Sequence, residues 1–154
     1  MRTSFYWENF VGFGMGPKKG EDGSYTLTLP LSETDLLPCI AAKDIGLCAA
    51  GIFANSSLIG KTVGIVGETL TCPQMAAKMS KHLKLEVKFK SIPHADYVSA
   101  DLPGGADIAN MFQWQAKNTE LFCSHRDRGL SKKLNPKLED FEKWLTANAA
   151  KIPL

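Results

Sequence analysis

The sequence predicts an α/β fold with a mainly parallel sheet. Three observations lead to this prediction: short strand-like segments recur along the chain, segments with helical apolar spacing separate them, and the composition is that of a folded globular protein. Of the 154 residues, 44% are hydrophobic and 22% are charged, and the formal net charge is +2. This composition argues against disorder, and the small net charge gives no case for a surface that binds nucleic acid or membrane.

The first part of the chain is expected to hold strands and one short irregular or helical stretch. Residues 2–7 are rich in aromatic and β-branched side chains and predict a strand. Residues 8–13 then turn helical or irregular, before a loop rich in Gly, Pro and Lys at 14–23. Residues 24–29 alternate polar and apolar side chains, which is typical of a strand, and residues 36–40 form a second apolar run.

The middle of the chain predicts a helix, a strand and a second helix. Residues 41–53 place apolar side chains on one face at helical spacing, and residues 62–66 form a short β-branched strand of the kind buried in parallel sheets. Thr71 begins the second helix. Gln74 three residues later completes a capping box, and Pro73 lies in the first turn.

The last part predicts one more strand and two helices. Residues 85–92 alternate again, and residues 107–115 are expected to be helical after a turn at 102–105. Asn135 and Pro136 are expected to open the final helix. Its apolar side would carry Leu138, Phe141, Leu145 and Ala149.

No complete catalytic or phosphate-binding motif is present. Gly12, Gly14 and Gly16 resemble the start of G-x-G-x-x-G, but Pro17 stands where the third glycine belongs and a loop follows, so a surface turn is expected. No tyrosine is followed by a lysine four positions later, so the Tyr-x-x-x-Lys dyad of a reductase is missing. The three histidines are scattered without metal-ligand spacing, and G-x-S-x-G is absent. Whether this chain is an enzyme is uncertain, and we expect that alone it is not.

The cysteines favour a reducing compartment. No C-x-x-C pair occurs, and reduced, mostly buried thiols are expected at all four positions. No run of apolar residues is long enough to cross a membrane, and the N-terminus does not read as a secretory signal. We therefore expect a cytoplasmic, possibly nuclear, protein. The cysteines are Cys39, Cys48, Cys72 and Cys123.

Two clusters leave alternatives open. The run Phe5-Tyr6-Trp7, followed by Glu8 and Asn9, fits a ligand pocket and a hydrophobic core equally well. A basic cluster before the last helix fits a solvated loop better than a docking patch for anions or protein. Its members are His125, Arg126, Arg128, Lys132, Lys133 and Lys137.

Several separated segments together resemble the NmrA-like family, which consists of atypical short-chain dehydrogenases/reductases. Each segment alone is a weak signal, but their order and spacing fit over nearly the whole chain. The segments are TSFYWENF at 3–10, AAKDIG at 41–46, IGKTVGI at 59–65, GADIANMF at 105–112, and LNP at 134–136 leading into FEKWL at 141–145.

The resemblance covers only the C-terminal half of such a protein. It implies the C-terminal part of an NAD(P)-binding Rossmann fold with a smaller α/β covering lobe. Residues 1–22 and 38–70 would be the remnant of the Rossmann sheet, and residues 23–37 and 71–154 would form the smaller lobe. The G-x-x-G-x-x-G loop of family members has no counterpart in this sequence. The stretch before the helix at 107–115 also departs from the family pattern.

For the site, the resemblance implies that the cofactor is NADP(H). In the family, one segment lies beside the nicotinamide end of the bound cofactor. The residues that match this segment here are Tyr6, Trp7, Glu8 and Asn9. Because the phosphate-binding loop has no counterpart here, we expect weak or absent NADP(H) binding by this chain alone.

Three functions follow as hypotheses from the resemblance. The first is an NADP(H)-binding redox sensor or regulator that is non-catalytic alone. The second is a fragment of an NAD(P)H-dependent oxidoreductase acting on a small carbonyl or quinone-like substrate. The third is a truncated product that acts only by protein contact. The expected partner is another protein or a second copy, bound through an exposed sheet edge.

Overall fold

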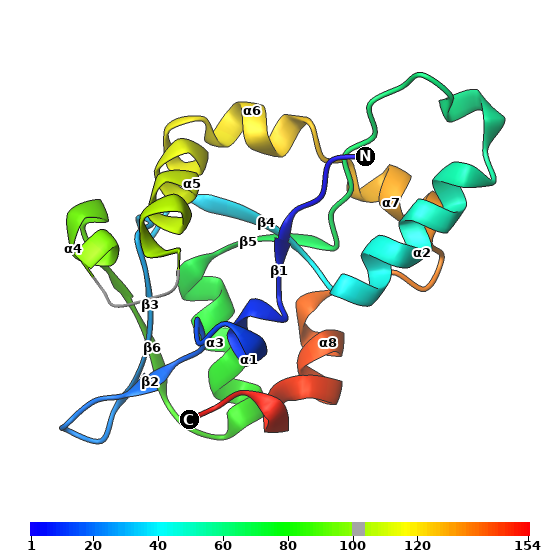
Figure 1. Ribbon diagram of the computed structural model, residues 1–154. Helices are drawn as coiled ribbons and strands as arrows, with labels where there is room; N and C mark the ends of the chain where they lie inside the picture. Colours follow the sequence, from blue (N-terminus) through cyan, green and yellow to red (C-terminus); the bar gives the residue numbers. More distant parts are fainter. Residues whose placement is uncertain (100–103) are drawn as a thin grey trace.

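A computed structural model of the chain describes residues 1–99 and 104–154, and its architecture is two small sheets surrounded by helices (Figure 1). The first sheet has the order β1-β4-β5 and consists of β1 (Phe5–Tyr6), β4 (Leu36–Ile40) and β5 (Glu68–Thr71). Its β1 and β4 are parallel, whereas β4 and β5 are antiparallel. The α/β class is therefore confirmed.

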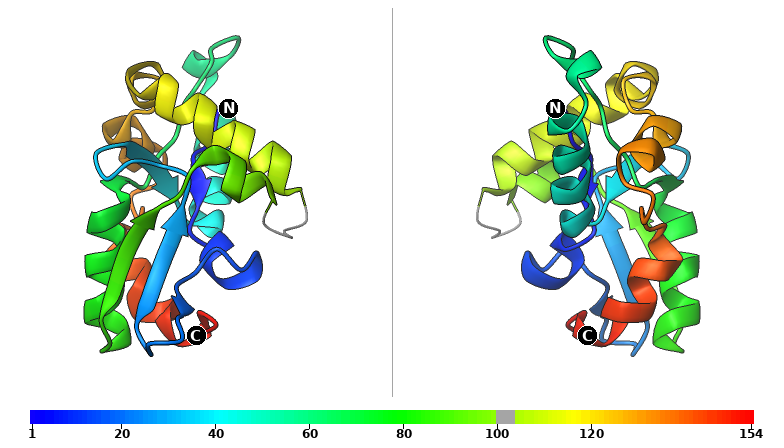
Figure 2. Two further views of the ribbon diagram at one scale, coloured as in Figure 1. Left: turned by 90° about the vertical axis from the view of Figure 1, so that its left-hand side faces the viewer. Right: turned by 90° about the vertical axis from the view of Figure 1, so that its right-hand side faces the viewer.

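The second sheet has the order β2-β3-β6 and is also mixed. It contains β2 (Lys18–Lys19), β3 (Tyr25–Leu29) and β6 (Val87–Ser91). The pair β2 and β3 is antiparallel, and β3 and β6 run parallel side by side with α3 along them (Figure 2). Each sheet thus joins one parallel and one antiparallel pair. The expectation of a mainly parallel sheet is wrong for the described part of the chain.

The helices lie around these sheets, with α3 packed against α8 and α2 against α7 (Figure 1). Two 3-10 turns, Ser56–Leu58 and Ala149–Lys151, follow α2 and α8. The helices are α1 (Asn9–Gly12), α2 (Ala42–Phe53), α3 (Cys72–Leu83), α4 (His94–Ser99), α5 (Gly105–Lys117), α6 (Thr119–Ser124), α7 (Arg128–Leu134) and α8 (Phe141–Asn148).

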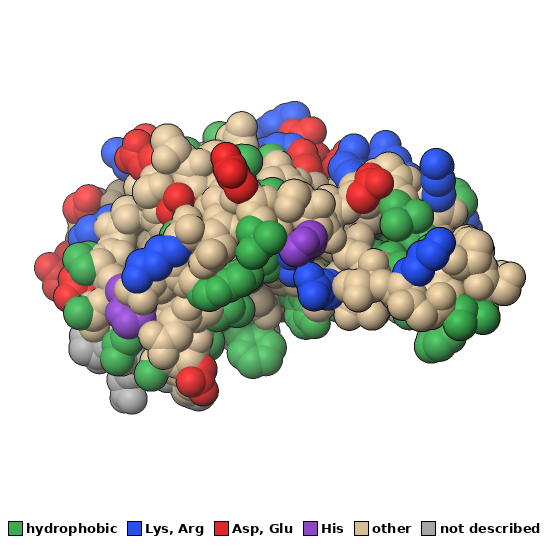
Figure 3. All heavy atoms as spheres, turned by 90° about the horizontal axis from the view of Figure 1, so that it is seen from above, with side chains coloured by type: hydrophobic (Ala, Val, Ile, Leu, Met, Phe, Trp, Pro, Cys, Tyr) green, Lys and Arg blue, Asp and Glu red, His purple; other side chains and the backbone are tan. Residues whose placement is uncertain are grey.

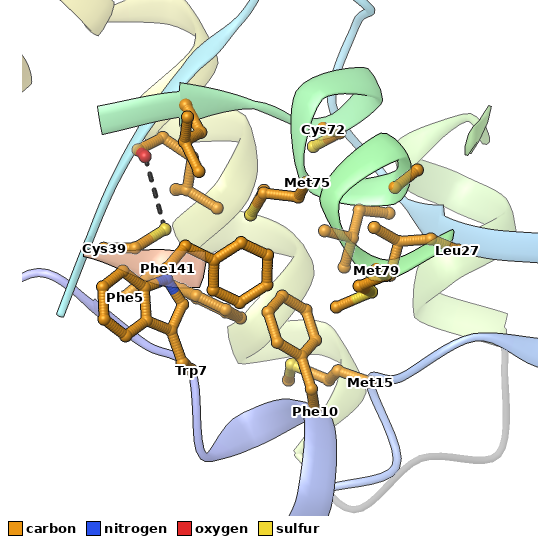
Figure 4. Close-up of a cluster of buried hydrophobic side chains, with 14 of the residues drawn as sticks. Phe5, Trp7, Phe10, Met15, Leu27, Cys39, Cys72, Met75, Met79 and Phe141 are labelled. Carbon is orange, nitrogen blue, oxygen red and sulfur yellow. Dashed lines mark hydrogen bonds between the residues drawn. The ribbon is translucent and has the colours of Figure 1, made fainter. Parts of the chain in front are cut away.

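The main core is built around aromatic rings from the two ends of the chain. Trp7 and Phe10 from the N-terminal segment pack against Phe141 of α8 (Figure 4). Trp7 also packs against Trp144 of the same helix, and all four side chains are buried. The ring centroids of Trp7 and Phe141 are 5.3 Å apart, and those of Phe10 and Phe141 are 5.9 Å apart. Such aromatic pairs stabilise a core beyond the area they bury. The N-terminal segment is therefore fixed by the C-terminal helix.

Two predicted elements differ from the structure in extent. Residues 62–66 are extended and mostly buried, but they pair only through an isolated parallel bridge between Arg2 and Gly64. The last helix begins at Phe141, where Asp140 caps it by accepting a hydrogen bond from Lys143 N at 2.9 Å. The expected start at residues 135–136 is wrong.

Several other expectations are confirmed, and some elements were not foreseen. The capping box of α3 is present, and the four cysteines are free, with three of them buried. The sequence did not predict β2, β5, α6 or α7. Part of the expected turn at 102–105 lies outside the described residues, and Gly104 before α5 has a left-handed φ of 71°. No helix of the described residues is long and apolar enough to span a membrane.

Candidate functional site

A cavity of about 280 Å³ lies beside β1, between the N-terminal segment and the pair α5 and α6. Figure 3 shows the molecule from above the view of Figure 1, and on that face hydrophobic side chains lie next to histidine and basic side chains. Two exposed apolar residues lie at the cavity: Met111 lines it, and the Trp114 ring packs against Phe122 of the lining. The cavity is lined by Thr3, Ser4, Phe5, Tyr6, Asn9, Met111, Gln115, Phe122 and Arg126.

Two of the four predicted site residues, Tyr6 and Asn9, line this cavity. Tyr6 ends β1, and its side chain is 39% exposed, so its ring is available to a ligand. Asn9 begins α1 and is half-buried, and its side-chain amide makes no hydrogen bond within the described residues. The structure therefore brings an aromatic face and a free amide to one cavity.

Trp7 and Glu8 point elsewhere. Trp7 is fully buried in the aromatic core. Glu8 Oε2 accepts a hydrogen bond from the backbone N–H of Ala42 at 2.9 Å, and Glu8 Oε1 accepts one from Trp144 Nε1 at 3.0 Å. Ala42 is the first residue of α2, where an anion is favoured by the helix dipole. Glu8 thus holds α2 and α8 together, and a cofactor contact from Trp7 or Glu8 stays a prediction.

Gln115 is a residue of the cavity that sequence reasoning missed. Its side chain is only 6% exposed, yet Oε1 is buried without a hydrogen-bond partner, as is Oγ1 of Thr3. A signal for it existed in the sequence. Gln115 lies three positions after Phe112 on the predicted helix, so it falls on the apolar face as an isolated polar residue.

The basic cluster divides into structural arginines and exposed lysines. Arg126 donates two hydrogen bonds to the carbonyl oxygen of Thr3 at 2.9 and 2.6 Å and one to that of Phe122 at 2.7 Å. Its guanidinium lies 3.6 Å from the centroid of the Phe122 ring, and burial lowers the pKa of Arg126. Arg128 similarly donates to the carbonyl oxygen of Gly67. These two arginines tie the segment after α6 to the chain itself.

The N-termini of three helices are occupied by side-chain oxygens of the chain itself. Helix N-termini bind phosphates when their N–H groups are free. The N-terminus of α2 is occupied by the Glu8 carboxylate, that of α3 by Thr71, and that of α8 by Asp140. These three N-termini are therefore not free to bind a phosphate.

The glycine turn at 12–16 is not a phosphate loop either. It follows helix α1 instead of opening one, and Gly14 adopts a left-handed φ of 65°. Gly16 is buried, and a Cβ atom there would lie 2.7 Å from the carbonyl oxygen of Phe10. Residues 12–14 of the turn are exposed, and residues 15 and 16 are buried. No group of three or more His, Cys, Asp or Glu side chains in the described residues is arranged to hold a metal ion.

Comparison with known proteins decides the family. The sequence profile of the NmrA-like family matches residues 1–145. The chain belongs to the NmrA-like family. Among curated proteins, Prestalk A differentiation protein A of Dictyostelium discoideum is 27% identical over 135 residues, which is 86% of this chain and 42% of that protein. The chain thus spans less than half the length of this curated relative.

Solved structures of related proteins have the same fold. The negative transcriptional regulator NmrA matches with a TM-score of 0.70 and 18% identity, covering 94% of this chain and 50% of the regulator. Triphenylmethane reductase of Citrobacter sp., solved with NADP(H), matches with a TM-score of 0.73 and 17% identity over 96% of this chain and 51% of its own. An NADPH-dependent quinone oxidoreductase of Escherichia coli matches with a TM-score of 0.69 and 18% identity, covering 96% of this chain and 52% of its own. The NmrA-like chain therefore has the fold of about half of an NAD(P)-binding protein.

Proposed function

We propose that this chain forms the nicotinamide-facing part of an NmrA-like, NADP(H)-binding redox-sensor or regulatory protein, and that alone it is non-catalytic. The observation that carries the proposal is the cavity beside β1, where Tyr6 and Asn9 are both open to a ligand. These two residues would hold the ring end of the cofactor. The cofactor itself supplies the hydride chemistry when bound.

Weak or absent binding of NADP(H) by the 154-residue chain is part of this proposal. Helix N-terminal contacts to the phosphates provide much of dinucleotide affinity. The N-termini of α2, α3 and α8 already bind side-chain oxygens of the chain itself. The remaining contacts to one ring are too few for tight binding.

Isothermal titration of NADPH into the 154-residue protein tests this proposal. We expect no binding in the low-micromolar range, because the phosphate contacts are missing. Binding at low-micromolar concentration would overturn the proposal of a weak site.

NADPH consumption in the presence of a small quinone, measured by absorbance, would instead favour a second function, a fragment of an oxidoreductase for small carbonyl or quinone-like substrates. That second function is supported by the shared fold of two reductases and by the partly apolar cavity.

We also propose that the chain associates with a protein partner, most simply a second copy, through the edge of β1. The outer strands of the second sheet carry exposed lysines, which discourage pairing: Lys18 and Lys19 on β2, and Lys88 and Lys90 on β6. Strand β1 lies at the edge of its sheet without any charge, and Tyr6 is exposed there. The free cysteines agree with action in the cytoplasm, with the nucleus as the second location.

A further inference from the structure

Two large hydrophobic side chains project from the end of the molecule where α2 finishes. Phe53 is 90% exposed and Ile59 is 81% exposed, and no other large hydrophobic residue that the structure describes is as exposed. Both line one surface hollow of about 350 Å³, together with Ile52 and Leu58. Single exposed apolar residues are ordinary, whereas two that border one hollow are typical of an interaction site.

The hollow has a rigid support. Asn55 Oδ1 accepts hydrogen bonds from Ser57 N at 3.1 Å and from Ser57 Oγ at 2.7 Å, which fixes the turn after α2. Below this turn, Ile52 and Leu58 pack against a buried apolar cluster that is separate from the aromatic core. Because the fold holds the hollow in shape, a partner would not have to order it on binding.

Lysines share this end of the molecule with the hollow. Residues 45–67 and 128–138, which run through α2, α7 and the turns after them, contain no Asp or Glu. Helix α7 packs against α2, and the backbone of Leu134 lies against Gly51 near the end of α2 (Figure 2, right-hand view). All lysines of the two segments are exposed, and none forms a salt bridge within the described residues: Lys61, Lys132, Lys133 and Lys137.

The carboxylates that border these segments in the sequence are already used by the fold. Asp127 caps the far end of α7 and accepts hydrogen bonds from two backbone N–H groups at 2.7 and 3.1 Å. Asp44 is fully buried at the start of α2. Glu68 and Glu139 form salt bridges with other lysines, at 3.0 and 2.8 Å. None of these carboxylates therefore neutralises the positive charge beside the hollow.

Charge and shape together select the occupant of this surface. Positive side chains beside an apolar hollow complement a segment that carries carboxylates next to apolar side chains. A second copy of this chain would bring the same lysines against themselves in a symmetric contact, which like charges oppose. A concave hollow of this volume accommodates one or two projecting side chains, and a bilayer surface presents none. These features favour an acidic segment of another protein.

We propose that this end of the molecule docks an acidic protein segment, with its apolar side chains in the hollow and its carboxylates paired with the lysines. We call the surface the α2–α7 end and define it by Phe53, Ile59, Lys61, Lys132 and Lys133. Its hollow shares no lining residue with the cavity beside β1. The inference therefore goes beyond the proposed function and does not depend on cofactor binding.

Selection from a phage library of random dodecapeptides on the immobilised 154-residue protein tests this inference. We expect the selected peptides to be enriched in Asp and Glu beside two or more apolar residues. One selected peptide, synthesised with a fluorescent label, is then titrated by fluorescence anisotropy. Phe53→Ser should weaken its binding about tenfold or more, because an apolar anchor is lost. The double variant Lys132→Glu, Lys133→Glu should weaken it about tenfold, and the wild-type affinity should fall as salt rises.

Matched controls carry the same changes elsewhere on the surface. Phe13→Ser removes another exposed ring, and the double variant Lys88→Glu, Lys90→Glu reverses two exposed charges on β6. Both should leave peptide binding unchanged. Every one of these variants should keep its Tm, because each substituted position is exposed.

Four outcomes would overturn the proposed occupant. The first is a selection that enriches no peptide or enriches peptides without an excess of acidic residues, and the second is peptide binding that survives Phe53→Ser. The third is sedimentation of the protein with phosphatidylserine vesicles that is lost in Phe53→Ser, which would assign the surface to an anionic membrane. The fourth is self-association that is lost in Phe53→Ser, measured by sedimentation velocity, which would assign it to a second copy.

Discussion

At the scale of single residues, Glu8 shows how one side chain can serve the structure at a position that the family resemblance assigns to a ligand. Both carboxylate oxygens of Glu8 accept hydrogen bonds, one from Ala42 N and one from Trp144 Nε1. The residues on either side of it, Trp7 and Asn9, face the core and the cavity respectively. Glu8 therefore fixes the segment that presents Tyr6 and Asn9.

Replacing Glu8 by Gln tests this role. The amide of Gln has only one acceptor, so its NH₂ group would face either the Ala42 N–H or the Trp144 N–H, and a donor would be left unpaired. We expect a loss of about 2 kcal/mol in the free energy of unfolding, measured by urea denaturation. Glu33→Gln, at an exposed position, is the control and should change little. An unchanged unfolding free energy for Glu8→Gln would contradict the structural role.

At the scale of elements, two glycines of α2 occupy opposite environments. A Cβ atom at Gly46 would have nothing within 4 Å, whereas one at Gly51 would overlap the backbone carbonyl oxygen of Leu134 at the end of α7. Neither glycine has a positive φ, so backbone strain is not involved. Gly51 thus permits the close approach of α2 and α7.

Matched alanine substitutions should therefore have opposite effects on stability. Gly46→Ala is expected to stabilise the protein by about 0.5–1 kcal/mol, because alanine favours the helix and nothing obstructs its methyl group. Gly51→Ala should destabilise it by about 1–3 kcal/mol, because the helices must move apart. Urea denaturation of the two variants measures both changes. Stabilisation by both substitutions would show that α2 and α7 leave room for a methyl group at position 51.

Some helices and strands were predictable from the sequence, and others were not. The helices α2 and α3 carry long apolar periodicity, and α3 has the capping pair Thr71 and Gln74 as well. Their prediction was confirmed. Strand β5 (Glu68–Thr71) was missed because Glu68 and Thr69 give it no alternating apolar pattern. It forms because β4 provides a partner in space, which periodicity cannot reveal.

The candidate site was predictable only in part. Tyr6 and Asn9 were named from the family resemblance, and they do line one cavity. Gln115 and Arg126 come from parts of the chain more than 100 residues away from β1. Single-sequence patterns describe neighbours along the chain, so they do not show that these residues meet. The family likeness supplied what spacing alone did not.

At the scale of the whole molecule, the exposed surface predicts self-association. Edge strands without charge offer unpaired backbone groups to another chain, and large exposed apolar side chains add to the attraction. Strand β1 is such an edge, and Phe53 at the end of α2 is 90% exposed. The two features lie in different parts of the structure, so they are separable by mutation.

We expect the protein to form dimers in a concentration-dependent manner, measured by sedimentation velocity. Tyr6→Lys should shift the equilibrium towards monomer, because a lysine on an edge strand resists pairing. Phe53→Lys introduces the same charge at the other feature, the end of α2, and should weaken association less than Tyr6→Lys, because no sheet edge lies there. If Phe53→Lys abolishes association and Tyr6→Lys does not, the contact runs through α2 and the proposed edge is wrong.

The aromatic core has a practical consequence for the study of this protein. Of its three tryptophans, Trp7 and Trp144 are buried next to each other, with ring centroids 6.0 Å apart, whereas Trp114 is 50% exposed. Acrylamide should quench the emission of Trp114 and spare the buried pair. The emission that remains arises from two rings that are both connected to residues 6–9. Trp7 is part of this segment, and Trp144 donates a hydrogen bond to Glu8 within it. Intrinsic fluorescence is thus a built-in optical reporter of events at the cavity.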